Sequence, residues 1–382
     1  MRVAAALLSL LCTLALLEGG YRAYKLARYG FVDYVDLTVA GYFVAHPVYG
    51  YALAKNFSSE QVPDPIRRSV YGINYSMGTK FTTNSLGYHS PEFSPAKPPG
   101  VFRIVTFGGS TTQGLEVDDG LNWPAQLEAF LNSDNFAAGA GANRVEVINA
   151  AVGGWRSLEN MLRLRDEVSR FAPDMLLLVF NWNDSWKALR NNLPFNEVTS
   201  IERPLWSHVK IFENLRSRYL NYQTRNERTI RNMTAGLRDD AAWAIGLRHH
   251  ILEMNNAAER IGARVVVIAL PGLCRPRDLA SPAGPAIVRL ASDDERLCRF
   301  WAALNEFEAK LFLDLGDDSG IPVINVREAF ERFESHERTR LFTDVMHLTV
   351  TGSRETAAAV ARGVRELAPD IDSEAGLVAG VR

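Results

Sequence analysis

The sequence has 382 residues, enough for one large domain or two ordinary ones, and its 47% hydrophobic content supports a well-filled core. Lys and Arg total 42 against 44 for Asp and Glu, which gives a formal net charge of -2. This composition excludes a disordered chain, and the charge balance provides no global basic field of the kind that binds nucleic acid.

The N-terminus carries an apolar segment. An uncharged run from Val3 to Leu17 follows the initial Met-Arg pair, and Glu18 interrupts it. The run is short for a spanning helix, which needs about 20 apolar residues, and it suits the core of a signal peptide equally well. Because no clean small-x-small cleavage site follows, residues 1–20 favour an uncleaved membrane anchor, with the rest of the chain facing the periplasm or the outside. If the segment is cleaved, the protein is secreted.

Residues 21–98 are rich in Tyr, Phe, Pro and Gly and show little periodicity, so we expect an irregular extension packed on the main domain. From Val101 onward, short apolar runs alternate with helical patterns, which indicates a parallel sheet buried on both faces. The predicted fold is a three-layer α/β/α sandwich of flavodoxin-like type with a five-stranded parallel sheet, and ligands are expected beyond the carboxyl ends of its strands. The expected strands are 101–107, 144–150, 175–180, 263–270 and 322–326, and the expected helices are 123–131, 157–171, 241–261, 293–315 and 352–367.

Two segments do not follow this alternation. Residues 185–240 are polar and aromatic and come directly after the third strand, where an insertion would overhang a site at the strand ends. Residues 369–382 are expected to form a loose tail. Three tryptophans near the insertion could stack on sugar rings or pack in the core: Trp182, Trp186 and Trp206.

The three cysteines are too few for a disulfide framework. Cys12 lies in the apolar run, whereas Cys274 and Cys298 lie in the part expected outside the membrane. For this pair, one disulfide and two buried thiols are equally compatible with the sequence.

A serine follows the first predicted strand, in the turn Gly108-Gly109-Ser110. A nucleophilic serine needs an exposed hydroxyl on a tight turn at a strand end, and glycine lets the backbone turn sharply. A serine that only caps the following helix would look the same.

The strongest partner for this serine lies beyond the last predicted strand, in Asp344-Val-Met-His347. An aspartate at this offset can accept the imidazole N–H, which leaves the other ring nitrogen free to take a serine proton. Only His347 among the seven histidines has a carboxylate three residues before it. The others show no metal-ligand spacing: His46, His89, His208, His249, His250 and His336.

Two further strands end in residues that can donate hydrogen bonds. Gly153-Gly154 follow the second strand and Asn183-Asp184 follow the third. Acyl transfer passes through a tetrahedral oxyanion, which backbone N–H groups and a side-chain amide can stabilise. Each pair could instead serve only to end a strand or form a turn. Their shared position, at carboxyl ends of predicted parallel strands, favours the oxyanion interpretation.

Taken in chain order, these features resemble the SGNH hydrolases, also called the GDSL esterase/lipase superfamily, over about residues 99–368. The resemblance implies that Ser110 is the nucleophile, that His347 is its general base and that Asp344 orients the base. It also implies an oxyanion hole formed by the Ser110 N–H with Gly154 and Asn183.

The chain departs from the pattern of this superfamily in two blocks. Gly108-Gly109-Ser110-Thr111 replaces the usual Gly-Asp-Ser-Leu, and Asn181-Trp182-Asn183-Asp184 replaces the usual Gly-x-Asn-Asp. The segment TTNSLGYHSPEF resembles a stretch found before the first block in membrane-anchored bacterial members. An α/β-hydrolase fold fits less well, because the Gly-x-Ser-x-Gly motif is missing and its acid normally lies far from its histidine in sequence.

The predicted function is that of a serine ester hydrolase that forms an acyl-enzyme and needs neither metal nor organic cofactor. The expected substrate is an ester of a small molecule or glycan, chiefly O-acetyl groups of a carbohydrate or cell-envelope glycan. The alternatives are a lipid-ester hydrolase of lipase or lysophospholipase type, an O-acyltransferase, and a membrane-tethered glycan-binding scaffold without activity. Nucleic acid is not expected as a partner, and the sequence leaves the oligomeric state open.

Overall fold

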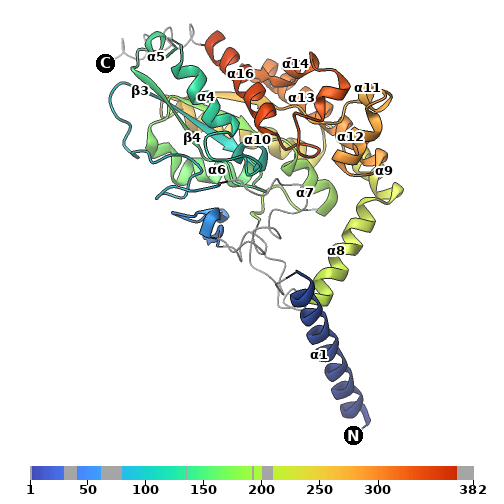
Figure 1. Ribbon diagram of the computed structural model, residues 1–382. Coiled ribbons are helices and arrows are strands. Elements are labelled where there is room, and N and C mark those ends of the chain that lie inside the picture. Colours follow the sequence, from blue (N-terminus) through green and yellow to red (C-terminus); the bar gives the residue numbers. More distant parts are fainter. Residues whose placement is uncertain are drawn as a thin grey trace.

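The computed structural model describes residues 2–29, 41–61, 80–134, 136–191, 193–199 and 210–367. At its centre lies a five-stranded sheet in the order β4-β3-β5-β6-β7, in which all neighbouring strands are parallel (Figure 1). The predicted fold class is confirmed. The strands are β3 (Val101–Gly108), β4 (Arg144–Asn149), β5 (Met175–Val179), β6 (Arg264–Ala269) and β7 (Val323–Asn325).

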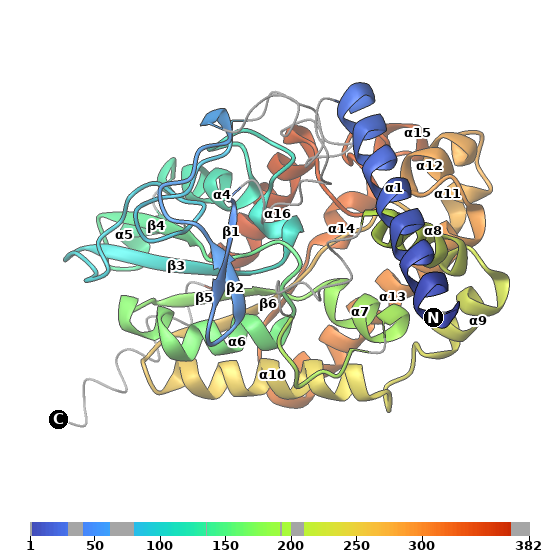
Figure 2. The same ribbon diagram turned by 90° about the horizontal axis from the view of Figure 1, so that it is seen from below.

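The sheet is buried because helices cover both of its faces. All residues of β3 and β5 are buried; β5 is accordingly a continuous apolar run, and β3 is apolar except for Arg103 and Thr106. The first face is covered by α4 (Trp123–Asn132), α14 (Val326–Glu331) and α16 (Val350–Glu366) (Figure 2). The opposite face is covered by α6 (Ser157–Asp166), α10 (Ala242–Glu259) and α13 (Glu295–Ser319).

The structure also contains helices that the sequence pattern did not predict. The described part of the 185–240 insertion contains helices, apart from residues 193–199 and short connections, and two four-residue helices lie within the connection from β3 to β4. The expected helix over 157–171 ends at Asp166 and gives way to a 3₁₀ turn at Val168–Phe171, after which Ala172 has a φ of 48°. The additional helices are α3 (Ser110–Gln113), α5 (Phe136–Gly139), α7 (Asn183–Asn191), α8 (Lys210–Thr224), α9 (Glu227–Ala235), α11 (Pro276–Leu279), α12 (Gly284–Ala291), α14 and α15 (Ser335–Arg338).

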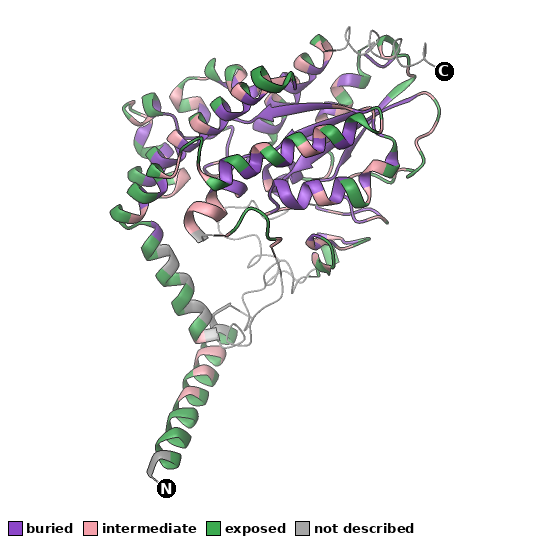
Figure 3. Ribbon diagram, turned by 180° about the vertical axis from the view of Figure 1, so that it is seen from behind, coloured by how far each residue is buried: buried purple, intermediate pink, exposed green. Residues whose placement is uncertain are grey.

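The N-terminal helix α1 (Arg2–Tyr29) projects away from the sheet and is exposed along most of its described length (Figure 3). Its segment Ala4–Tyr24 is long and apolar enough to cross a membrane. The helix continues past the apolar run because Glu18 forms an ion pair with Arg22 at 2.8 Å, one turn further on. Glu18 also accepts a hydrogen bond from the Ile211 N–H at 3.0 Å, which joins α1 to α8.

The segment after α1 contains a hairpin where the sequence suggested irregular structure. Strands β1 (Phe43–His46) and β2 (Gly50–Leu53) pair in antiparallel fashion. A short 3₁₀ helix, η1 (Ser59–Gln61), follows them. Aromatic side chains from this region form a second apolar cluster, which includes Leu115, Val152 and Trp155 of the sheet domain. The hairpin therefore packs beside the loops that follow β3 and β4.

Cys274 and Cys298 form a disulfide, which settles the alternative that the sequence left open. The bond joins the loop after β6 to α13. Cys12 is a free, exposed cysteine on α1.

Candidate active site

The structure brings Ser110 and His347 together although 237 positions separate them in the chain. Ser110 is the first residue of α3, directly beyond β3, and His347 lies in the loop before α16. The Ser110 hydroxyl lies 2.7 Å from His347 Nε2, and His347 Nδ1 lies 2.7 Å from Asp344 Oδ2. The three side chains thus form one hydrogen-bonded line, which is the arrangement that activates a hydroxyl as a nucleophile.

The turn that presents Ser110 requires glycine at two positions. A Cβ on Gly108 would lie 2.6 Å from Thr112 Oγ1, and a Cβ on Gly109 would collide with Asn183 Nδ2. The chain can therefore pass from β3 into α3 only because these residues lack side chains. Gly114, with a φ of 75°, ends α3 after one turn.

Asp344 fixes both the loop and the ring of His347. Its Oδ1 accepts the N–H groups of Met346 at 2.9 Å and His347 at 2.8 Å, while Oδ2 faces Nδ1. A carboxylate only accepts, so Nδ1 carries a hydrogen and Nε2 accepts the Ser110 hydroxyl hydrogen. The loop closes on itself through the Thr343 N–H, which donates to the His347 carbonyl at 2.8 Å.

Asn183 lies next to the turn that carries Ser110, and Gly154 follows Gly153, on which a Cβ would lie 3.8 Å from Ser110 Cβ. Gly154 has a φ of 79°, a conformation that favours glycine, and within the described residues its N–H has no hydrogen-bond partner. Asn183 is the first residue of α7, and its amide donates one hydrogen bond to the Trp155 carbonyl at 2.8 Å. An amide has a second N–H, so Asn183 keeps a donor available near Ser110.

Groups outside the expected site hold the loop that carries Gly154. The Gly153 N–H donates to Gln113 Oε1 at 2.6 Å, and its carbonyl accepts the Tyr51 hydroxyl at 2.9 Å. Lys187 Nζ donates to the Gly154 carbonyl. Burial lowers the pKa of Lys187 to about 8. Sequence reasoning missed these three side chains, because they come from β2, α3 and α7 and meet only in the folded chain.

Asp184, next to Asn183, serves a different network. Its carboxylate accepts from the Ser157 N–H at 3.0 Å and from the Ser157 hydroxyl at 2.5 Å. His250 Nδ1 lies 2.7 Å from the same hydroxyl. In this cluster the serine lies between the other two groups, whereas in a triad the histidine takes the central position. All three side chains are buried. The cluster therefore connects α6, α7 and α10 and does not activate a nucleophile. Burial raises the pKa of Asp184 to about 6 and lowers that of His250 to about 4.

Two neighbouring carboxyl groups raise the pKa of His347. Burial alone lowers the pKa of His347, but the negative charges of Glu116 and Asp344 outweigh this effect and raise it to about 9. Burial likewise raises the pKa of Asp344, but His347 lowers it below its usual range. Glu116 was not predicted as a site residue. The sequence signal was an acidic residue within an otherwise apolar and small stretch, Gly114 to Val117.

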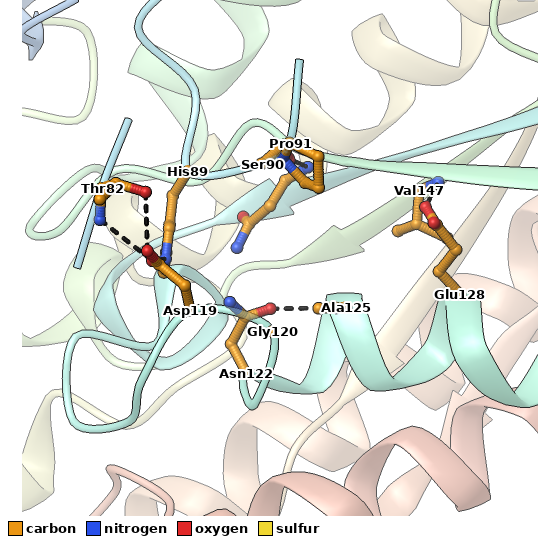
Figure 4. Close-up of a pocket in the computed structure, with 11 residues that line it drawn as sticks. Thr82, His89, Ser90, Pro91, Asp119, Gly120, Asn122, Ala125, Glu128 and Val147 are labelled. Carbon is orange, nitrogen blue, oxygen red and sulfur yellow. Dashed lines mark hydrogen bonds and ion pairs between the residues drawn. The ribbon is translucent and has the colours of Figure 1, made fainter. Parts of the chain in front are cut away.

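A separate hollow lies next to the segment that contains TTNSLGYHSPEF, and Figure 4 shows its lining. Asp119 accepts from the Thr82 N–H at 3.0 Å, from the Thr82 hydroxyl at 2.7 Å and from His89 Nε2 at 2.9 Å. His89 Nδ1 faces the Gln113 carbonyl at 2.7 Å. These contacts anchor the segment against the end of α3. None of the residues expected at the active site lines this hollow.

The tryptophans expected near the site pack in the interior. Trp182 is 2% exposed, which favours core packing over sugar stacking, the two alternatives that the sequence left open for its ring. Its φ is 74°, and Glu308 accepts its backbone N–H at 3.0 Å. Trp186 is half-buried and stacks near Trp301, with ring centroids 4.5 Å apart. Trp206 lies outside the described residues.

Within the described part of the chain, no group of three or more His, Cys, Asp or Glu side chains could hold a metal ion.

The fold and this constellation are those of an α/β serine hydrolase. The chain matches the GDSL-like lipase/acylhydrolase family over residues 106–355 and belongs to it. It is a serine ester hydrolase of this family. A search of the curated proteins finds no significant match.

Several solved structures are similar in fold. An acetyl xylan esterase, AlAXEase, is 15% identical, with 69% of this chain and 99% of that chain covered and a TM-score of 0.42. The acetylxylan esterase Axe2 from Geobacillus stearothermophilus is 10% identical, with 69% and 93% covered and a TM-score of 0.41. A lipase/acylhydrolase from Enterococcus faecalis is 18% identical, with 69% and 95% covered and a TM-score of 0.38.

Proposed function

We propose that this protein hydrolyses acyl esters through an acyl-enzyme on Ser110, with His347 as general base and Asp344 as its orienting partner. The observation that carries the proposal is the hydrogen-bonded line from Ser110 Oγ through His347 to Asp344. In the first step Oγ attacks the ester carbonyl carbon while its proton moves to Nε2. Nε2 then gives this proton to the departing alcohol oxygen as the ester C–O bond breaks.

The negative charge of the tetrahedral intermediate needs donors on the side of Ser110 where the carbonyl oxygen lies. The Ser110 N–H, the Gly154 N–H and the Asn183 amide fill this role in the proposed mechanism. The uncommitted Gly154 N–H and the second Asn183 N–H support this assignment, because preorganised donors need no rearrangement as charge develops.

Water completes the reaction in the proposed hydrolysis. Nε2 takes a proton from the water as its oxygen attacks the acyl carbon, and the Ser110 oxygen leaves with that proton. A sugar hydroxyl in the place of water would give an O-acyltransferase with the same residues, which is the second outcome that a product analysis can show.

For the substrate we propose a short acyl ester, such as an O-acetyl group of a carbohydrate or cell-envelope glycan. Polar groups support this choice, because the Tyr51 hydroxyl, the Gln113 amide and the Glu116 carboxyl all lie around Ser110 and its loops. These groups are themselves buried, so a long acyl chain would meet polar atoms beside Ser110 where it needs apolar surface. A lipid ester is the alternative, suggested by the apolar helix α1.

For the location we propose that α1 anchors the protein in a membrane, as in the anchored bacterial type of this family. The exposed apolar segment Ala4–Tyr24 supports this, and a secreted form would arise if it were cleaved. We further propose that residues 99–368 form the catalytic domain with 185–240 as its insertion, and that residues 21–98 are an extension of it. The tail 369–382 lies outside the described residues.

The test is steady-state hydrolysis of nitrophenyl esters with acyl chains from two to twelve carbons. The wild type is expected to prefer acetyl and propionyl esters, and Ser110→Ala is expected to lose activity. Ser133→Ala serves as a matched control, because Ser133 is an exposed residue that ends α4. A preference for long chains would replace the carbohydrate ester by the lipid ester, and equal activity of Ser110→Ala and wild type would refute the mechanism.

A further inference from the structure

A second carboxyl group faces His347 from the side opposite Asp344. Glu116 Oε1 lies 3.6 Å from Nε2, whereas Asp344 is bonded to Nδ1. Nε2 is also the nitrogen that faces Ser110. Each ring nitrogen of His347 therefore has an acidic neighbour, and the Glu116 carboxyl is next to the nitrogen that would carry the transferred proton.

Glu116 is buried, and one of its two carboxyl oxygens lacks a hydrogen-bond partner among the described residues. Its side chain is 3% exposed, and Oε1 is shielded from solvent with no hydrogen-bond partner among the described residues. Burying a carboxylate is unfavourable unless a positive charge or donors compensate. Burial raises the pKa of Glu116 to about 7, and the charge of His347 is the largest influence in the opposite direction.

The backbone around Glu116 holds it in this position. Gly114 ends α3, where its N–H donates to the Ser110 carbonyl at 2.9 Å, and its positive φ turns the chain back toward His347. A Cβ on Gly114 would lie 2.6 Å from Asn122 Cβ. Leu115 and Val117, on either side of Glu116, are both buried. Glu116 therefore cannot withdraw into solvent without disrupting the packing of its neighbours.

We infer that Glu116 is a positioning residue for the ester reaction, which stabilises the imidazolium form of His347 from the Nε2 side while Asp344 stabilises it from the Nδ1 side. The inference rests on the proposed function, since it takes His347 as the group that receives the Ser110 proton. When Oγ bonds to the acyl carbon and its proton reaches Nε2, the new N–H lies beside the Glu116 carboxylate. Two opposite charges then face each other in a site shielded from water, where their attraction is strong.

Among the described residues, two carboxyl groups raise the pKa of His347: Glu116, from the turn after α3, and Asp344, from its own loop. The charges that influence Glu116 are those of His347 and Asp344. Because the base must be neutral to accept a proton, activity rises as pH rises through the pKa of His347. Removing the Glu116 charge lowers that pKa, so the acidic limb of the pH profile moves to lower pH.

The test compares Glu116→Gln and Glu116→Asp in the full chain in detergent, with kcat/KM measured against pH on an acetyl ester. The acidic limb of Glu116→Gln is expected to move down by about 1 pH unit or more, because an opposite charge at this range shifts a pKa by about 1–3 units. Glu116→Asp keeps the charge and is expected to keep a limb close to the wild-type position.

Glu128→Gln is the matched control. Burial also raises the pKa of Glu128, and its Oε2 accepts the Val147 N–H at 2.7 Å, a bond that an amide oxygen can keep. Glu128 is not among the groups that influence His347. Its variant is expected to leave the acidic limb unchanged.

A titration of His347 itself separates this inference from the proposed function. In protein with ¹³C-labelled histidine, the His347 signal is assigned from its absence in His347→Asn and followed with pH by NMR. The inference predicts a wild-type pKa well above 6.5 and a lower one in Glu116→Gln, whether or not the protein hydrolyses the ester tested. Equal pKa values in a folded Glu116→Gln would overturn it. If that variant does not fold, a wild-type pKa at or below 6.5 overturns it instead.

Discussion

A Cβ atom on Gly109 would collide with Nδ2 of Asn183. The two residues lie at the ends of adjacent parallel strands, β3 and β5, and the missing side chain lets the amide approach the turn that carries Ser110. The glycine in the Gly-Gly-Ser turn therefore has two effects. It permits the turn, and it makes room for the amide that we propose as an oxyanion donor.

Gly109→Ala is expected to lower kcat by about 10²-fold, because the new methyl group displaces the Asn183 amide. The measurement is kcat on an acetyl ester together with a thermal unfolding curve. Gly139→Ala is the control, since a Cβ at that position meets no atom within 4 Å. A fully active Gly109→Ala would show that the amide does not need its present position.

Asn183→Ala is expected to reduce kcat by about 10²- to 10³-fold with little change in KM, because the amide acts only when negative charge develops on the oxygen. Combined with Gly109→Ala, the loss should be much smaller than the product of the two single losses, because both variants remove the same donor. Independent, multiplying losses would contradict this coupling.

Asp344→Asn is expected to lower kcat by about 10⁴-fold while the fold is retained. The amide can present an N–H to Nδ1, which would leave Nε2 with the hydrogen and unable to accept one from Ser110. Circular dichroism and kcat/KM, measured across the pH range, check this expectation. Loss of less than about tenfold would mean that Asp344 does not set the tautomer.

The disulfide between Cys274 and Cys298 closes a loop with a sequence separation of 24. Replacing both cysteines with serine is expected to lower the free energy of unfolding by about 3 kcal/mol, because the unfolded chain regains the entropy that the link removed. Activity at low temperature is expected to persist, because neither residue contacts Ser110 or His347. Denaturant unfolding of the double variant and the wild type measures the difference, and equal midpoints would contradict the expectation.

The sheet could be predicted from the sequence because most strand residues are buried, so that the strands are short segments rich in apolar residues. Ser110 could be selected because it directly follows such a strand in a Gly-Gly-Ser turn, and His347 because an aspartate lies three residues before it. The helices of the insertion could not be predicted from the sequence, because α7, α8 and α9 carry polar residues on much of their surface. The positive φ at Trp182 could not be predicted either. The backbone N–H of this residue donates to Glu308, which lies 126 positions away in the chain.

The supporting residues of the site share one reason for having been missed. Tyr51, Lys187 and Glu116 act through contacts that cross from one segment to another, and none belongs to a local motif. Each has an ordinary sequence context and gains its role only from what the fold places beside it. Local pattern identifies residues that must follow a strand, whereas long-range packing decides what surrounds them.

Activation of Ser110 as the nucleophile is tested most directly by mapping the site at which a fluorophosphonate modifies the protein. This reagent traps a serine that a base has activated. The protein is treated with the probe, digested, and the modified peptide is sequenced by mass spectrometry. We predict one adduct, on Ser110, which is lost in Ser110→Ala and strongly reduced in His347→Asn. A folded wild type with no adduct, or an adduct on another serine, would contradict it.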